Sequence, residues 1–274
     1  MRSRTGCGTL LCAVGICGTV AAQQATPPPA RASTTIEIVE PTARWFDRAK
    51  LARLVEQIVP MVEKYSELRF TKPPVVRAAD DGTWIELVLA ENPGARDKDL
   101  TVAITWGLYL PERDEVVLSP FLTDALMRAA DGSNSERDAF ARPMLAHELV
   151  HVLQEQHYQL PSRLQKTSAA WAKLMLGSLT EGHATWVEEQ IGVGEFHYAD
   201  YVQWSRKRHR AARRMAYLRG RDYVANLAAE GGMKAVHEAL GGPVPTEREF
   251  ARLALRKAGA AAPPEGPAGR AGKQ

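Results

Sequence analysis

The amino-acid sequence predicts an α+β fold, with a small antiparallel sheet followed by a mainly helical C-terminal part. Between Pro74 and Ser119, short runs of β-branched and apolar residues alternate with turn-forming residues, which is typical of strands. After Pro120, apolar residues recur at helical spacing almost to the end of the chain. A chain of 274 residues is long enough to bury a sizeable core in one domain.

The first residues, 1–22, predict a secretory signal peptide. A short basic start is followed by an apolar run from about Thr9 to Ala22 that ends in small residues. The run is too short for a comfortable membrane span, so we expect cleavage after Ala22 and export to the periplasm or the extracellular space, without a stable membrane span. The remaining chain divides into a flexible spacer (23–35), a single domain (36–258) and a disordered Ala/Gly/Pro-rich tail (259–274).

The cysteine and charge contents exclude several kinds of chemistry. All three cysteines, Cys7, Cys12 and Cys17, lie in the predicted leader, so the exported chain would have no disulfide, no thiolate ligand and no cysteine nucleophile. The leader also carries two of the 35 basic residues and none of the 32 acidic ones, which leaves a net charge of +1. Such a balance gives no reason to expect nucleic acid as a partner.

Local patterns place the expected elements along the chain. Apolar residues at helical spacing predict a helix from Trp45 to about Leu68, in which Pro60 could introduce a kink. Strands are expected at Val75–Val76, Trp84–Val88, Thr101–Thr105 and Glu115–Leu118. Turns are expected between them at Asp80–Gly82, Asn92–Gly94 and Pro111–Asp114, and the last two strands are expected to form a hairpin.

The strongest chemical signal is the pentapeptide His147-Glu148-Leu149-Val150-His151, which lies in a predicted helix from Ala139 to His157. Two histidines four residues apart lie on one face of a helix and can bind a single metal ion, while the glutamate between them can reach a water bound to that metal. The pattern indicates a zinc-dependent hydrolase, most often a peptidase. It would hold one Zn²⁺ ion on His147 and His151, with Glu148 as the general base.

Catalytic zinc normally has three protein ligands, so a third must come from another segment. Glu181 is favoured, because a turn near Leu160–Pro161 and a helix from about Ser168 would return it antiparallel to the histidines. Its neighbours Gly182 and Ala184 are small enough to let two helices approach closely around an ion.

Two histidines compete with Glu181 for this role. His157 lies off the ligand face of its helix, whereas His183 lies beside Glu181 but on a different helix face, so both cannot easily bind one ion. Thr185 and Glu188, one and two turns after Glu181, are expected as hydrogen-bond partners that orient a ligating histidine.

Substrate binding and turnover require further groups. Candidates for a hydrogen-bond donor to the oxyanion are Tyr158, Tyr198, Tyr201 and His197. An edge strand within Thr101–Leu110 could hold an extended peptide by strand addition.

Other interpretations remain open at this point. The two histidines could be surface residues with Glu148 in an ion pair. Glu148–His151 also fits the E-x-x-H of a di-iron helical bundle, but such a site needs a second E-x-x-H, which the sequence lacks. The basic cluster from Arg206 to Arg221 could contact an anionic surface or substrate, or form the solvated face of a helix.

The segment from His147 to Tyr158, followed by Glu181-Gly182-His183-Ala184-Thr185, resembles a group of secreted metallopeptidases of the gluzincin type. Their pattern reads roughly HELVHxLQDQHF and then EGDAT, and the likeness covers roughly Met144 to Phe250. The resemblance implies a zincin-like fold with His147, His151 and Glu181 as zinc ligands and Glu148 as the base. The sequence departs from the pattern at three positions, Glu155, Tyr158 and His183, where the group has Asp, Phe and Asp.

The sequence therefore predicts an exported zinc metallopeptidase that hydrolyses peptide or protein substrates through metal-activated water. The alternative is a non-catalytic exported protein that keeps the zincin scaffold for binding or assembly. An intact Glu148 favours the enzyme, since binding zinc alone does not require this carboxylate. The signature of the gluzincin aminopeptidases is absent from the sequence, and the oligomeric state stays open.

Overall fold

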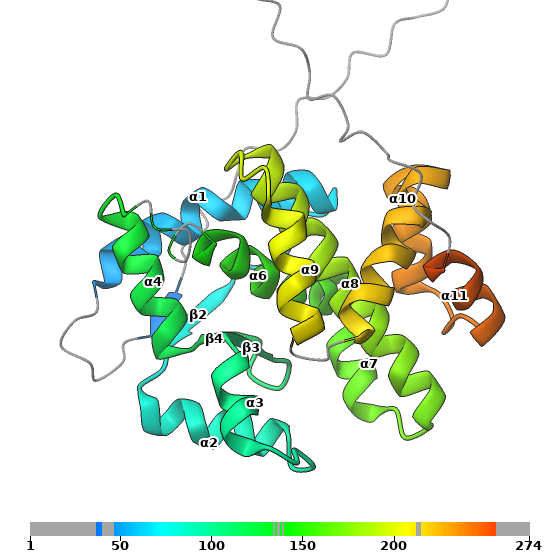
Figure 1. Ribbon diagram of the computed structural model, residues 1–274, viewed down its shortest axis with the longest axis horizontal. Coiled ribbons are helices and arrows are strands. Elements are labelled where there is room, and N and C mark those ends of the chain that lie inside the picture. Colours follow the sequence, from blue (N-terminus) through cyan, green and yellow to red (C-terminus); the bar gives the residue numbers. More distant parts are fainter. Residues whose placement is uncertain are drawn as a thin grey trace, which may run out of the picture. The chain divides into compact units, whose positions relative to one another are not determined.

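A computed structural model of the chain describes residues 37–39, 47–133, 135, 138, 140–211 and 215–255 (Figure 1). The predicted signal peptide (1–22), spacer (23–35) and tail (259–274) lie outside the described residues. Among the described helices, none is long and apolar enough to cross a membrane.

The first long helix, α1 (Arg48–Ser66), confirms the helix predicted in this region. The side chain of Asp47 caps its N-terminus by accepting a hydrogen bond from the backbone N–H of Lys50. The helix ends at Glu67, whose φ of 54° belongs to the left-handed region. Its apolar face is buried in the core through Leu51, Leu54, Val55, Ile58, Val59 and Val62.

The sheet is mixed, so the prediction of an antiparallel sheet is wrong. Its strands lie in the order β1 (Glu37–Val39), β2 (Val75–Ala78), β4 (Glu115–Leu118) and β3 (Gly107–Leu110). β2 pairs in parallel with both β1 and β4, whereas β3 and β4 pair antiparallel. Parallel neighbours need a long crossover connection, and the helices between these strands provide it.

Two segments predicted as strands, Trp84–Val88 and Thr101–Thr105, are mainly helical. They belong to α2 (Asp81–Glu91) and α3 (Lys98–Ile104), and each helix is capped by an aspartate side chain that accepts a backbone N–H. In α2 the two buried residues, Trp84 and Val88, are four apart. A spacing of four lies on one face of either a helix or a strand, so the pattern could not separate the two structures.

β3 and β4 form the predicted hairpin, but its first strand lies at residues 107–110 rather than 101–105. The connecting turn lies at Pro111–Asp114, as predicted, with Asp114 in the left-handed region at φ 49°. The hydroxyl of Tyr109 donates a hydrogen bond of 2.6 Å to the Asp114 carboxylate and braces the turn. Because β3 is last in the strand order, it is an edge strand of the sheet.

The helical C-terminal part is confirmed. It comprises α4 (Pro120–Ala130), α6 (Ala141–Tyr158), α7 (Leu160–Lys166), α8 (Ala170–Gly194), α9 (Tyr201–Ala211), α10 (Met215–Gly241) and α11 (Glu247–Ala254). The turn expected near Leu160–Pro161 is the first turn of α7. The path of α10 is broken at Gly231 and Gly232, where the backbone is not helical.

α6 carries the pentapeptide and is buried on every side from Pro143 to Gln154. It packs against α1, α4 and α8 and against the β3–β4 hairpin. One apolar core surrounds α6, and a second lies between α7, α8, α10 and α11, with α8 contributing to both. A helix buried in this way must satisfy most of its polar side chains with protein partners, because little of its surface reaches water.

The backbones of α8 and α10 touch where Gly182 meets Gly220. A Cβ atom on Gly182 would overlap the backbone of Gly220, and one on Gly220 would overlap the carbonyl of Ser178. The two glycines therefore allow an approach that no larger residue permits. The crossing also sets the position of the neighbouring Glu181 relative to Tyr217, three residues before Gly220.

We expect Gly182→Ala to lower the free energy of unfolding by about 1–3 kcal/mol, because the added methyl group forces the two helices apart. Gly177→Ala is the matched control on the same helix, since its new Cβ would meet only Leu164, at 3.8 Å. That control should be neutral or stabilise the protein by up to about 1 kcal/mol. Urea denaturation measures both variants; equal effects at the two positions would contradict the close crossing.

Candidate metal centre

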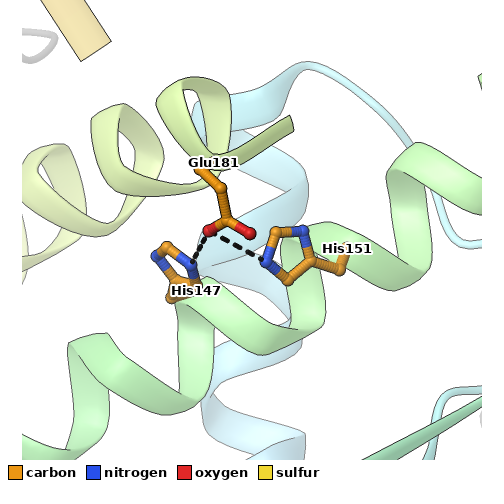
Figure 2. Close-up of side chains that lie close together, drawn as sticks. All are labelled: His147, His151 and Glu181. Atoms are coloured by element: carbon orange, nitrogen blue, oxygen red, sulfur yellow. Dashed lines mark hydrogen bonds and ion pairs between the residues drawn. The ribbon is translucent and has the colours of Figure 1, made fainter. Parts of the chain in front are cut away.

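His147, His151 and Glu181 place one ligand atom each within 4.8 Å of one another. The histidines extend from adjacent turns of α6, and Glu181 points at both of them from α8 (Figure 2). Oε2 of Glu181 lies 3.3 Å from Nε2 of His147 and 3.8 Å from Nε2 of His151. Two helices that are neighbours in space but separated in sequence thus build a compact group of two imidazoles and one carboxylate.

Hydrogen bonds on the far side of each imidazole decide which nitrogen faces Glu181. Nδ1 of His147 lies 2.7 Å from the carboxylate of Glu188, and Nδ1 of His151 lies 2.9 Å from the amide oxygen of Gln154. Because both partners are acceptors, each Nδ1 carries a hydrogen and donates it. Nε2 is therefore the nitrogen of each ring that faces Glu181 and can bind a metal ion.

Glu188 is fully buried and makes two strong contacts. One oxygen accepts the bond from His147, and the other accepts a bond of 2.6 Å from the hydroxyl of Tyr201, with Arg208 at 4.0 Å. Burial alone would raise the pKa of Glu188, but the bond to His147 and the charge of Arg208 outweigh it and lower this pKa. The carboxylate is therefore a charged group that orients His147.

Gln154 links the two helices beside Glu181. Its amide nitrogen donates to the backbone carbonyl of Thr180 at 2.9 Å and lies 3.1 Å from Nδ1 of His183, while its oxygen accepts from His151. His183 is thus two hydrogen bonds away from His151 and does not join the ligand group. Thr185 is buried, and its hydroxyl has no hydrogen-bond partner among the described residues.

The donor set fits zinc. Two nitrogen ligands and one carboxylate are a common set for catalytic zinc, and in a tetrahedral site with bonds of about 2.0–2.1 Å the ligand atoms lie about 3.3 Å apart. The two separations from Glu181, 3.3 and 3.8 Å, are close to that value. Burial alone would lower the pKa of His147, yet its bonds to Glu181 and Glu188 raise it above the ordinary value of 6.5.

Glu148 lies beside the ligand group and against strand β3. A Cβ atom on Gly107 would overlap the Glu148 side chain, so glycine at this position leaves room for the carboxylate. Burial raises the pKa of Glu148, and the nearby histidines only partly oppose this effect. A raised pKa makes this carboxylate a stronger base.

The ligand group and Glu148 line one pocket. Its walls come from β3, α6, α7 and α8, and its remaining lining includes Trp106, Arg208 and Tyr217. Tyr217 is not among the site residues that the sequence predicts. Its ring stacks on His147 at a centroid distance of 6.1 Å, and its hydrogen bond helps to lower the pKa of Glu181, which burial alone would raise.

The residues considered for oxyanion stabilisation lie elsewhere. Tyr201 donates to Glu188, and Tyr198 packs on Phe140 at 5.7 Å. Tyr158 packs on His237 at 6.3 Å, and His197 is exposed in the segment after α8. The competing ligand His157 is exposed as well and contacts the Arg69 carbonyl at 2.7 Å. None of these five lines the pocket of the ligand group within the described part of the chain.

Comparison with known proteins adds no relative: no family model, no curated protein and no solved structure matches this chain.

We expect zinc to bind more tightly as pH rises. The raised pKa of His147 means that zinc must displace a proton near pH 7, so affinity should rise about tenfold per pH unit between about pH 6 and 8. Calorimetric titration with zinc chloride in buffers of different ionisation enthalpy counts the released protons. His151→Ala should abolish tight binding, whereas His157→Ala should bind like the wild type. Binding that ignores pH, or that survives in His151→Ala, would count against the site.

Proposed function

We propose that this chain is an exported zinc-dependent metallopeptidase with a zincin-like site. The observation that carries the proposal is the convergence of His147, His151 and Glu181, with Glu148 in the same pocket. The predicted leader supports export. Of the described residues, the three ligands form a group to which Glu148 does not belong, which leaves that carboxylate available as a base.

Glu148 is suited to move a proton. Zinc, when bound by the three ligands, would polarise a peptide carbonyl and acidify a water molecule. Burial raises the pKa of Glu148, which makes the carboxylate better able to accept a proton from water and return it to the leaving amine. Gly107 keeps the carboxylate and the edge strand in direct contact.

The edge strand β3 supports binding of an extended peptide beside Glu148. The carbonyl of Trp106 accepts a hydrogen bond of 2.9 Å from the N–H of Ser119 on the β4 side. In an antiparallel pair the bonding direction alternates, so the backbone groups of Gly107 and Tyr109 point away from β4. Both residues line the pocket, and a substrate strand added here would cross the general base.

Tyr217 is the best-placed donor for the developing oxyanion. It lines the pocket, stacks on His147 and interacts with Glu181, so its hydroxyl lies on the ligand side of the pocket. A phenol keeps its proton at neutral pH and can donate it in a hydrogen bond to a negatively charged oxygen.

Glu148→Gln should abolish peptide hydrolysis while leaving fold and metal content unchanged, because the amide keeps the shape of the side chain but cannot accept the proton. A loss of about 10²–10⁴-fold in kcat is expected. Cleavage of casein, followed together with zinc content and circular dichroism, checks this outcome. Full activity in the variant would remove the mechanism, and an inactive wild type with bound zinc would favour a binding or assembly protein.

Tyr217→Phe should reduce kcat by about 10²–10³-fold with a smaller change in KM, because the lost donor acts mainly on the transition state. Tyr198→Phe removes a hydroxyl outside the pocket and serves as the matched control. Steady-state kinetics on one peptide substrate compare the two variants. Equal activities for both would exclude Tyr217 as the oxyanion donor.

A further inference from the structure

The basic cluster predicted between Arg206 and Arg221 does not form a single solvated face. Arg206 pairs with Asp222 at 2.7 Å, and Arg221 pairs with the buried Glu189 at 2.6 Å. Arg208 differs from both, because it lines the pocket of the candidate metal centre. Ion pairs like those of Arg206 and Arg221 therefore do not explain the role of Arg208.

We propose that Arg208 binds a carboxylate of the substrate close to the cleaved bond. The inference rests on the proposed peptidase function and adds a substrate class to it: peptides that carry a carboxylate one or two residues from that bond. The carboxylate can be a free C-terminus or the side chain of aspartate or glutamate.

Two indole rings hold the Arg208 guanidinium in place. Its central carbon lies 5.5 Å from the ring centroid of Trp106 and 5.2 Å from that of Trp204, and its side chain is 19% exposed. Contact with aromatic faces stabilises a guanidinium while leaving the N–H groups at its edge available for hydrogen bonds. The side chain is therefore fixed in position before any ligand arrives.

Among the described residues, no carboxylate lies at hydrogen-bond distance from Arg208. Its nitrogens contact the sulfur of Met144 and lie 3.3 Å from Nε2 of His209. Of the described carboxylates, that of Glu188 is the ion-pair partner, at 4.0 Å, and its two oxygens already accept bonds from His147 and Tyr201. A cation with five donors in a partly enclosed pocket, and with no carboxylate at hydrogen-bond distance, is suited to bind one from a ligand.

The position of Arg208 relative to His147 determines which residue of a bound peptide can place its carboxylate beside the guanidinium. Arg208 contacts Met144, which precedes His147 by three residues on α6, a rise of about 4.5 Å along the helix. An extended peptide advances about 3.3 Å per residue. A carboxylate on the first or second residue from the bond beside the ligand group would therefore reach the guanidinium.

Three matched peptides on one core test the preference, together with their cleavage products. The first ends in a free carboxylate, the second ends in an amide and carries glutamate, and the third ends in an amide and carries glutamine. We expect the wild type to cleave one or both carboxylate peptides about 10–100-fold faster in kcat/KM than the glutamine amide. A preference for the first identifies a C-terminal carboxylate, and a preference for the second identifies an acidic side chain.

Arg208→Met should lower kcat/KM for the carboxylate peptides at least about tenfold more than for the neutral peptide, so that the preference is lost. Arg208→Lys keeps the charge but not the planar fork, so part of the preference should remain. Arg210→Met removes an exposed arginine from the same helix and should behave like the wild type.

A binding measurement separates this inference from the proposed function. Because Trp106 and Trp204 flank Arg208, N-acetyl-glycylglycine should change the tryptophan fluorescence of the zinc-loaded protein, whereas its amide should bind at least about tenfold more weakly. Arg208→Met should bind both equally. A wild type that cleaves no peptide but shows this difference would refute the peptidase and keep the carboxylate site.

Two outcomes would overturn the inference. One is a wild type that neither cleaves nor binds carboxylate peptides better than their amides. The other is an Arg208→Met protein that loses zinc and slows equally on all three peptides, since Arg208 would then act only by compensating the charge of Glu188.

Discussion

The hydrogen bond between Glu188 and His147 is the contact on which the rest of the candidate site depends. Both side chains are buried, and removing one partner from such a pair typically costs about 3–5 kcal/mol. The bond turns Nε2 of His147 toward Glu181, while the second oxygen of Glu188 accepts the hydroxyl of Tyr201. One carboxylate on α8 therefore fixes a ligand on α6 and anchors α9, the helix that also carries Arg208.

This hydrogen-bond network can form only where the backbones of neighbouring elements lie unusually close to one another. Gly182 and Gly220 allow α8 and α10 to touch, and Gly107 allows strand β3 to lie against Glu148. Glycine in a helix interior costs about 1 kcal/mol relative to alanine, so the first two positions give up helix stability to gain proximity. The buried polar bonds and the apolar surfaces around them must offset that cost. The hydrogen bonds of the buried polar groups therefore depend on the close approach of the backbones.

The sequence predicts the part of this site that is local. The spacing of His147 and His151 is a property of one helix, and the positions of Glu181 and Glu188, two turns apart, follow from another. Trp84–Val88 and Thr101–Thr105 are predicted as strands but are mainly helical; the apolar spacing of Trp84 and Val88 fits a strand as well as a helix, and both helices begin at an aspartate cap. Tyr217 is not among the predicted site residues, and Arg208 is predicted only as part of the basic cluster, because both reach the pocket through the packing of α9 and α10 against α8, which no local pattern encodes.

Charge balance explains why so many ionisable groups can share this interior. Glu181 and Glu188 both have lowered pKa values despite burial, which by itself raises them, and His147 has a raised one, so the metal-free pocket favours a protonated imidazole between two carboxylates. A divalent cation on the three ligands would displace that proton and balance the same two carboxylates. Apart from the ligand Glu181, the described carboxylates that line the pocket are Glu91 and Glu148, and Glu148 is the group proposed to gain a proton during turnover. A carboxylate brought by the substrate would compensate the positive charge of Arg208 when Glu148 becomes neutral. Substrate binding at Arg208 and proton transfer to Glu148 would therefore be coupled through the net charge of the pocket.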